Sequence, residues 1–470
     1  MNEPLHYLTL HQVAQLVKTK QLSPVELTRH MLERIDSLDG KLHSYATLTS
    51  DLALQQAKAA EADIMAGHYK GPLHGIPIAV KDLCYTRNIK TMGGLRVRRD
   101  FVPDFNATVV DRLAEAGSVL LGKLALTEGA LSGYHRDFEI PVNPWGDDLW
   151  AGVSSSGCGV ATAAGLCFGS LGTDTGGSIR YPSMANGIVG LKPTYGRVSR
   201  HGVLELAGSL DHVGPMTRSV ADAATLFNAI AGRDAQDPTS LDEPFTAIAD
   251  QSGADLSGIR IGVDEDYIAR GTDPGLVIAI QQVIQSLQSL GAELVTLTMP
   301  QDDPMDLRNA WIPVTAYEAA RAHAAYYPAR ADEYGGYLGD VLQIGHGMSA
   351  EDYAEATQRR QQIAARFESE LQKVDAVICP SGGSVFAVEQ AIQYGDMETL
   401  KPVIRKFQGQ FTLPADLAGT PALTVPCGLS ARRSPYAVQF LGRKMSESTL
   451  CRIGSAYQSI SHWHEQHPPM

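Results

Sequence analysis

The chain has few cysteines, and none of them stands near another. Six cysteines are spread over 470 residues without a Cys-x-x-Cys pair. This spacing gives no sign of a disulfide framework or of a thiolate metal site. We therefore expect reduced thiols and a cytoplasmic protein. The six residues are Cys84, Cys158, Cys167, Cys379, Cys427 and Cys451.

Long apolar runs and basic blocks are also missing. No apolar run reaches the roughly 18 residues that a membrane-spanning helix needs. The first residues lack the charged segment and apolar core of a secretory signal. The formal net charge is −13, without a cluster of basic residues. We therefore expect neither a nucleic-acid partner nor a membrane partner.

Nucleotide and metal signatures are incomplete. The segment 117–124 is nearly a phosphate-binding loop, but Leu124 stands where Ser or Thr would reach magnesium. The histidines of 462–467 do not form His-Glu-x-x-His, because Pro468 takes the place of the second histidine, so we expect a solvated tail. The sequence predicts no metal and no cofactor. It leaves the oligomeric state open, with a homodimer among the options.

Helical and strand patterns alternate along the chain. Hydrophobic residues make up 44% and glycines number 45, which suits a loop-rich α/β enzyme. A capping sequence with proline at the first helical position opens a helix at Ser23-Pro24. The alternation favours a mixed or mostly parallel sheet covered by helices on both faces, although length alone would suggest two or three domains. The patterns predict helices over 23–35, 51–66, 108–116, 160–166, 219–231 and 274–290, and strands over 76–80, 118–121, 259–263, 293–297 and 374–379.

Two serine loops and a lysine stand out from this background. Ser178 directly follows Gly176-Gly177, Ser154 lies in a second loop of small residues, and Lys81 ends the apolar segment 75–80. Glycines allow backbone N–H groups to converge on one point. A hydroxyl beside such donors provides both the nucleophile and the oxyanion site that acyl transfer needs.

Ser178, Ser154 and Lys81 together fit an acyl-transfer reaction. A serine hydroxyl is a poor nucleophile until a base takes its proton, and lysine is a base only when it is neutral. Lys81 ends a strand that we predict to be buried, and burial lowers the pKa of a lysine. Ser154 would then relay a proton between Lys81 and Ser178. The oxyanion would be held by backbone N–H groups of the glycine loop, from Thr175, Gly176, Gly177 and Ser178.

The segments that carry these residues resemble the amidase signature family. The central match is Asp174-Thr-Gly-Gly-Ser-Ile-Arg180, and the similarity covers most of the chain. It includes segments 71–81, 122–128, 143–144, 152–158, 165, 171–182 and 190–202, with a weaker match at 414–421 and 424–428.

The resemblance implies a Ser-cisSer-Lys triad. Ser178 matches the nucleophile, Ser154 matches the serine after a cis peptide bond, and Lys81 matches the base. The family's Gly-Gly-Ser-Ser-Gly-Gly-Ser loop begins at Gly152 here. Ser156 adds a rival for the bridging hydroxyl, but the register favours Ser154. The loop departs from the family at three positions, Val153, Ser156 and Cys158.

The resemblance also implies the fold and a set of supporting residues. We expect one large α/β/α domain over 1–470 with a mixed central sheet. Its parts would be an N-terminal helical region at about 1–70, a core motif region at about 71–215, and variable insertions at 235–258 and 299–370. Ser155 and Arg180 match supporting positions, and Asp174 should orient the loop backbone as in an Asx turn. We assign these three residues and Asp82 to the scaffold.

The substrate pocket is the least defined part. We expect it to draw on segment 126–150 and on the region around 311–317. Aromatic side chains there would suit an apolar or aromatic acyl or amine group, and ordinary core packing explains them equally well. The expected pocket residues are Tyr134, His135, Phe138, Trp145, Trp311 and Tyr317.

The sequence thus predicts an amidohydrolase that cleaves the carboxamide C–N bond of a small-molecule amide. One alternative is the A subunit of an aminoacyl-tRNA amidotransferase, which draws ammonia from glutamine. Its glutamine-site arginine and aspartate would fall near Asp340 and Gly409, which disfavours glutamine. Another alternative is an inactive amidase-like scaffold that only binds partners, and the intact Lys81, Ser154 and Ser178 argue against it.

Overall fold

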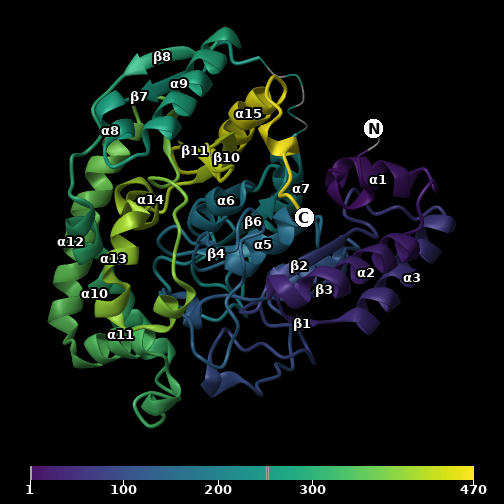
Figure 1. Cartoon of the computed structure of the whole chain (residues 1–470), viewed down its shortest axis with the longest axis horizontal. Helices are drawn as coiled ribbons and strands as arrows, with labels where there is room; N and C mark the ends of the chain where they lie inside the picture. Colours follow the sequence, from purple (N-terminus) through teal and green to yellow (C-terminus); the bar gives the residue numbers. More distant parts are fainter. Residues whose placement is uncertain (1–2, 250, 252, 254) are drawn as a thin grey trace.

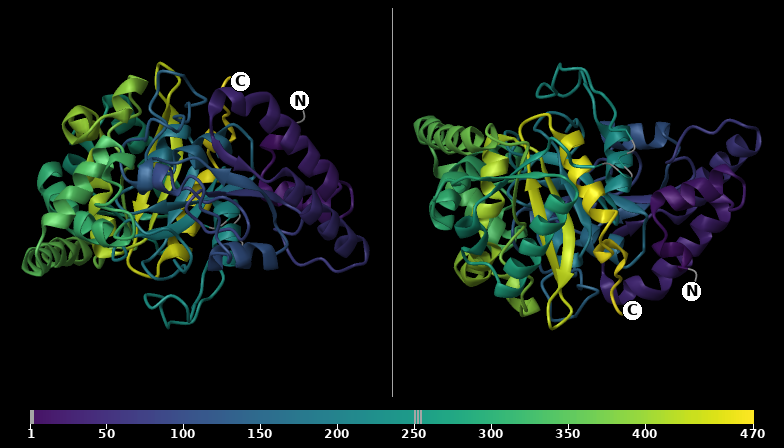
Figure 2. Two further views of the ribbon diagram at one scale, coloured as in Figure 1. Left: turned by 90° about the horizontal axis from the view of Figure 1, so that it is seen from below. Right: turned by 90° about the horizontal axis from the view of Figure 1, so that it is seen from above.

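A long mixed β-sheet runs through the molecule, with helices on both faces (Figures 1 and 2). The computed structural model describes residues 3–249, 251, 253 and 255–470. Within these residues the sheet has eleven strands, in the order β1-β3-β2-β4-β6-β5-β10-β11-β9-β7-β8. The strands are β1 Tyr45–Leu48, β2 Pro77–Lys81, β3 Val119–Leu124, β4 Gly169–Asp174, β5 Val189–Lys192, β6 His212–Thr217, β7 Arg260–Val263, β8 Glu293–Thr296, β9 Ala376–Pro380, β10 Ala422–Leu429 and β11 Pro435–Leu441.

Parallel strand pairs lie on either side of an antiparallel middle, and the edge strand β1 pairs antiparallel with β3. Strand β2 runs parallel to β3 and β4, and β7 runs parallel to β8 and β9. Between them, β6, β5, β10 and β11 pair antiparallel with their neighbours. Strand β4 is buried along its whole length, from Gly169 to Asp174. The predicted α/β class with a mixed central sheet is confirmed.

Local signals explain where several helices begin. The Ser23 side chain accepts hydrogen bonds from the N–H groups of Val25 and Glu26, and Pro24 occupies the first turn. This confirms the predicted start, although the helix continues to Leu42. The helices are α1 Leu10–Lys18, α2 Pro24–Leu42, α3 Ser50–Met65, α4 Thr108–Glu115, α5 Ser156–Ala163, α6 Arg180–Asn186, α7 Val220–Ile230, α8 Glu265–Ala269, α9 Pro274–Ser289, α10 Pro304–Ala322, α11 Gly336–Gly347, α12 Ala350–Leu371, α13 Met397–Ile404, α14 Leu413–Ala418 and α15 Glu447–Gln458.

The segment 299–370, which we expected to be an insertion, forms the helices α10, α11 and α12. Helix α10 packs on both α11 and α12, and α10 and α12 also pack on α14 (Figure 1). Of the other expected insertion, 235–258, positions 250, 252 and 254 lie outside the described residues, as do positions 1 and 2 of the N-terminal region.

The two ends of the described chain meet (Figures 1 and 2). The His467 ring stacks on Tyr7 with ring centroids 3.7 Å apart, and its Nε2 lies 2.7 Å from a Glu3 carboxylate oxygen. The expected solvated tail therefore holds for most of the 462–467 segment, whose residues His462, Trp463, Glu465 and Gln466 are exposed, while stacking on Tyr7 covers much of the His467 ring. No described helix is both long and apolar enough to cross a bilayer.

All six cysteines are buried and free of disulfide bonds, as expected for reduced thiols. In the described part of the chain, no group of three or more His, Cys, Asp and Glu side chains is arranged to hold a metal ion.

Candidate active site

Lys81 ends strand β2 with its side chain fully buried. Its ammonium nitrogen Nζ lies 2.7 Å from Ser154 Oγ and 2.8 Å from Thr173 Oγ1. Burial lowers the pKa of Lys81 from 10.5 to about 8, because the charged form loses its hydration, and nearby acidic groups offset only part of this effect. A lysine in this setting supplies a neutral amine at moderately alkaline pH.

The three consecutive serines before helix α5 have separate partners. Ser154 contacts Lys81 and follows a cis peptide bond from Val153. The Ser155 hydroxyl donates to the carbonyl of Thr173 at 3.1 Å. The Ser156 hydroxyl accepts from the Tyr134 hydroxyl at 2.7 Å. Of the three serines, Ser154 is the one whose hydroxyl contacts Lys81.

Helix α5 brings this loop close to the sheet because its residues are small. Gly157 illustrates the constraint, since a Cβ there would lie 2.5 Å from the carbonyl oxygen of Ala125 and 2.6 Å from that of Ser44. A larger residue at Gly157 would push the start of α5, and Ser154 with it, away from Lys81.

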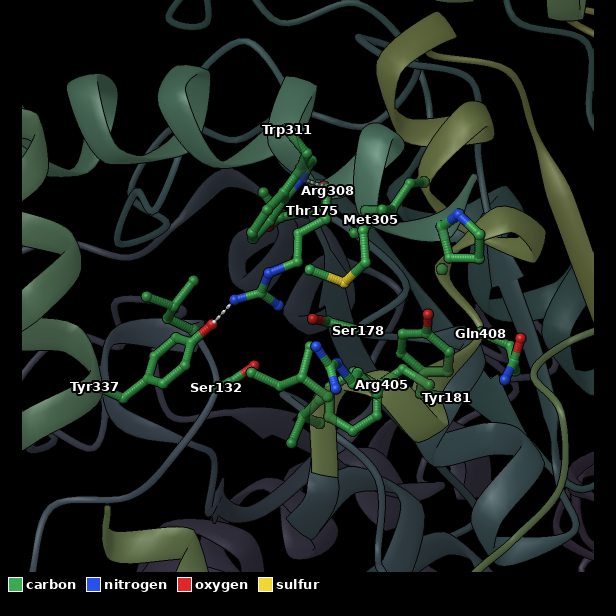
Figure 3. A pocket seen from close by; sticks show the side chains of 18 of the residues that line it. Ser132, Thr175, Ser178, Tyr181, Met305, Arg308, Trp311, Tyr337, Arg405 and Gln408 are labelled. Atoms are coloured by element: carbon green, nitrogen blue, oxygen red, sulfur yellow. Dashed lines mark hydrogen bonds between the residues drawn. The ribbon is translucent and has the colours of Figure 1, made fainter. Parts of the chain in front are cut away.

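Ser178 lies in the turn between β4 and α6. Its neighbour Gly177 has φ +125°, and a Cβ there would come within 2.4 Å of the Tyr181 ring. Only glycine adopts this positive φ and also fits beside the Tyr181 ring without strain. The N–H of Ser155 donates to the carbonyl of Ser178 at 3.3 Å, so the two serine loops lie side by side. The Ser178 hydroxyl points into the cavity of Figure 3.

Backbone donors surround Ser178. The N–H groups of Thr175, Gly176 and Ser178 have no acceptor among the described residues. The N–H of Gly177 differs, because it donates to the Asp174 carboxylate at 2.5 Å. Three of the four N–H groups expected at an oxyanion site are therefore free to donate to a substrate oxygen. The fourth, from Gly177, stabilises the loop conformation through Asp174.

A buried ion network supports the turn. The Arg180 guanidinium contacts Asp174 at 3.1 Å and Asp416 at 2.6 Å, and all three side chains are fully buried. Burial alone would raise the pKa of Asp174, but the Arg180 charge holds it below its usual range. Burial and the nearby Asp174 charge raise the pKa of Asp416. Asp174 also accepts from the N–H of Ile179 at 3.0 Å, which fixes the backbone beside Ser178.

Asp82 belongs to a separate buried pair. One carboxylate oxygen lies 3.4 Å from Lys123 Nζ, and the other accepts from the N–H of Met92 at 3.0 Å. The Lys123 ammonium also donates to the Cys84 carbonyl at 2.7 Å and to Thr91 Oγ1 at 2.8 Å. These contacts agree with a scaffold role for Asp82.

A cavity of about 310 Å³ opens in front of Ser178 (Figure 3). Its walls come from the 130–132 segment, the glycine loop, α10, α11 and the 404–413 segment. The lining residues are Ala130, Leu131, Ser132, Val153, Thr175, Gly176, Ser178, Tyr181, Leu206, Asp303, Pro304, Met305, Arg308, Trp311, Tyr337, Ile404, Arg405, Phe407, Gln408, Gly409 and Leu413.

Of the aromatic residues expected in the pocket, Trp311 lines this cavity. Its Nε1 donates to the carbonyl of Thr175 at 2.8 Å. Tyr134 instead points to Ser156, behind the serine loop. His135 is buried, and its Nδ1 accepts from the N–H of Asp137 at 3.0 Å.

Trp145, Tyr317 and Phe138 are also absent from the cavity lining. The Trp145 Nε1 donates to the carbonyl of Asn186 at 2.9 Å. The Tyr317 ring stacks on Tyr353 with centroids 4.1 Å apart. Phe138 packs edge-on against His135. For these residues the alternative of ordinary packing fits the structure better than a place in the pocket.

Sequence reasoning missed several residues of the site. Thr173 holds Lys81 from the neighbouring strand, and strand pairing was the missing information. Asp416 lies in the segment 414–421 that carried the resemblance, but nothing in its pattern indicated contact with Arg180. Arg308 and Arg405 enter the cavity from distant segments, and neither has a motif that could have identified it.

Comparisons with known proteins agree with this geometry. The family model Amidase matches residues 26–451. The candidate amidase AmiD of Mycobacterium tuberculosis is 45% identical over 471 residues, covering 98% of this chain and 96% of that protein. The A subunit of glutamyl-tRNA(Gln) amidotransferase from Geobacter metallireducens is 37% identical and covers 98% of each chain. The structure of native peptide amidase from Stenotrophomonas maltophilia covers 99% of each chain, with a TM-score of 0.85 at 29% identity. This chain belongs to the amidase family.

Proposed function

We propose that this protein hydrolyses the carboxamide bond of a small amide through an acyl-enzyme on Ser178. The observation that carries the proposal is the contact between a buried lysine and a serine, Lys81 to Ser154 at 2.7 Å, beside a second serine that faces a cavity. Free backbone N–H groups next to that second serine support the same conclusion.

In the first half of the reaction, neutral Lys81 takes the proton of the Ser178 hydroxyl by way of Ser154. The Ser178 oxygen attacks the amide carbonyl, and the oxyanion is stabilised by the N–H groups of Thr175, Gly176 and Ser178. Removal of one such donor typically costs about 10²–10³-fold in rate. The C–N bond then breaks, and the leaving amine takes the proton from Lys81 through Ser154.

In the second half, water replaces the amine. Neutral Lys81 takes a proton from water by way of Ser154, and the resulting nucleophile attacks the ester carbonyl. The same N–H groups hold the second oxyanion. The bond to Ser178 breaks, Ser178 recovers its proton, and the carboxylic acid leaves. Each proton that Lys81 accepts is returned within the cycle, so the residues present suffice for hydrolysis.

A glutamine-dependent role in an amidotransferase has less support. Asp340 lies away from the cavity lining, and one of its oxygens accepts from the N–H of Met397 at 3.0 Å. Gly409 lines the cavity but offers no charged group. The similarity to the amidotransferase sequences keeps glutamine in the test panel as a competing substrate.

The test is turnover of a panel of small amides, including glutamine, by wild type and by Ser178→Ala. We expect wild type to release ammonia from at least one amide and Ser178→Ala to release less than a hundredth as much. Ser132→Ala is the matched control, because Ser132 also lines the cavity but lacks the lysine relay. Higher residual turnover in Ser178→Ala would move the nucleophile elsewhere, and no turnover with any amide would favour an inactive scaffold.

A further inference from the structure

The cavity in front of Ser178 carries an excess of positive charge. Its charged lining residues are Arg308, Arg405 and Asp303. The Asp303 carboxylate is already engaged, because it accepts from the N–H of Met305 at 2.8 Å and caps helix α10. Two guanidinium groups therefore face the cavity in a protein whose formal net charge is −13.

Most donors of these two arginines are unused. One Arg308 nitrogen donates to the Tyr337 hydroxyl at 2.7 Å. A guanidinium has five N–H donors, so four remain. In the described part of the chain no carboxylate lies within ion-pair distance of Arg308 or Arg405, and the Arg405 side chain has no hydrogen-bond partner there. Arg180, by contrast, is held by two carboxylates.

Figure 3 shows how the two side chains lie. Arg308 comes from helix α10 and Arg405 from the 404–413 segment, and both guanidinium groups point into the cavity where the Ser178 hydroxyl ends. Arg308 is half-buried and Arg405 is exposed at the mouth. The same lining includes apolar residues, among them Met305, Trp311 and Leu413.

We propose that the amide substrate carries a carboxylate, which Arg308 and Arg405 bind while Ser178 attacks the amide. This inference rests on the proposed function and names its substrate class. A guanidinium matches a carboxylate with two parallel hydrogen bonds, which gives both affinity and orientation. The cavity, at about 310 Å³, is at the small end of ligand pockets. A short chain of methylene groups between amide and carboxylate suits this size and the apolar walls.

The test compares amides of similar size with and without a carboxylate. In the first pair, succinamate carries its charge on the acyl side of the amide bond, and the diamide succinamide is its neutral partner. In the second pair, N-butyrylglycine carries its charge on the amine side, and N-propylbutyramide is its neutral partner. We expect kcat/KM to be at least tenfold higher for the anion in one of the two pairs, and that pair identifies the side that the arginines face. A ratio near one in both pairs, with measurable turnover, overturns the inference.

Substitutions assign the preference to the two arginines. Arg308→Gln and Arg405→Gln should each lower the ratio of anionic to neutral kcat/KM at least threefold, and the double variant at least tenfold. Arg308→Glu should shift preference towards the cationic amide 4-aminobutyramide. Arg321→Gln is the matched control, because Arg321 lies on the same helix but stacks on Tyr317 outside the cavity lining. A ratio that is unchanged in the double variant, or that falls equally in Arg321→Gln, contradicts the assignment.

Binding separates this inference from the proposed reaction. Calorimetry with the Ser178→Ala protein needs no turnover, and in at least one of the two pairs it should show the anion binding at least tenfold more tightly than its neutral partner. Such binding without hydrolysis by wild type would support the anion site and refute the proposed function. Equal binding of anion and neutral compound within both pairs, with normal hydrolysis by wild type, would refute the anion site alone.

Discussion

The pH dependence of turnover tests whether Lys81 is the base. Burial lowers the pKa of Lys81 from 10.5 to about 8. At pH 7, a lysine with pKa 8 is roughly 9% neutral, whereas one with pKa 10.5 is about 0.03% neutral. The buried position therefore supplies about 300-fold more neutral amine at pH 7 than a solvated lysine would. This gain lies within the range of about 10²–10⁴-fold that general-base catalysis contributes.

The assay is kcat/KM for one small amide measured from pH 5 to pH 10. The charged form of Lys81 cannot accept a proton, so activity should fall as pH drops below the lysine pKa. We expect a rising limb with a slope of one in a logarithmic plot and a plateau above about pH 8. The profile of kcat/KM reports the pKa values of groups in the free enzyme.

Two lysine variants complete this test. Lys81→Ala should lose the rising limb and at least a hundredfold in activity near neutral pH. Lys192 is the matched control, because burial also lowers its pKa to about 8, while its Nζ donates to the carbonyl of Pro193 at 3.2 Å. Lys192→Met should keep the rising limb. A loss of less than tenfold in Lys81→Ala, or a rising limb that depends on Lys192, would refute Lys81 as the base.

Four further predictions concern the rest of the site. Ser154→Ala should reduce kcat/KM more than replacing either of the two serines that follow it, and a larger effect of Ser156→Ala would move the relay to that residue. Gly177→Ala should lower kcat at least tenfold, because its Cβ would come within 2.4 Å of the Tyr181 ring, and unchanged kinetics would show that the turn tolerates a side chain. Arg180→Met should lower the free energy of unfolding by about 3–5 kcal/mol in urea titrations, because it leaves buried carboxylates unpaired. Arg233→Met, at an exposed pair with Asp242, should change it by less than about 1 kcal/mol, and equal effects would contradict the network's role. Incubation with a chelator should leave turnover unchanged, whereas a loss that zinc restores would overturn the metal-free mechanism.

Local sequence patterns predicted the elements with strong signals. The start of α2 follows from Ser23 and Pro24, and α9 has a clear helical period from Pro274. Strand β2 reads as a short apolar run ending at Lys81. Strands such as β4 and β5 were not predicted, because Gly169–Asp174 and Val189–Lys192 contain glycine and polar residues that lack an alternating pattern. Pairing within the buried sheet stabilises them.

Site residues that lie in recognisable sequence segments were predicted, whereas contacts between distant segments were not. The likeness of segments around Lys81, Ser154 and Ser178 to a known family brought together residues that periodicity could not connect. The contact of Arg180 with Asp416 joins residues 236 positions apart, and only the folded chain shows it. Aromatic composition could not distinguish Trp311, which lines the cavity, from aromatic residues that pack elsewhere.

The most direct test of the central claim is to locate the covalent adduct of a fluorophosphonate by peptide mass spectrometry. The probe reacts with an activated serine and needs no knowledge of the natural substrate. We expect a single modified residue, Ser178, in wild-type protein, and labelling at least a hundredfold slower in Lys81→Ala. Modification of another serine, or no modification of correctly folded wild-type protein, would contradict the assignment of Ser178 as the nucleophile.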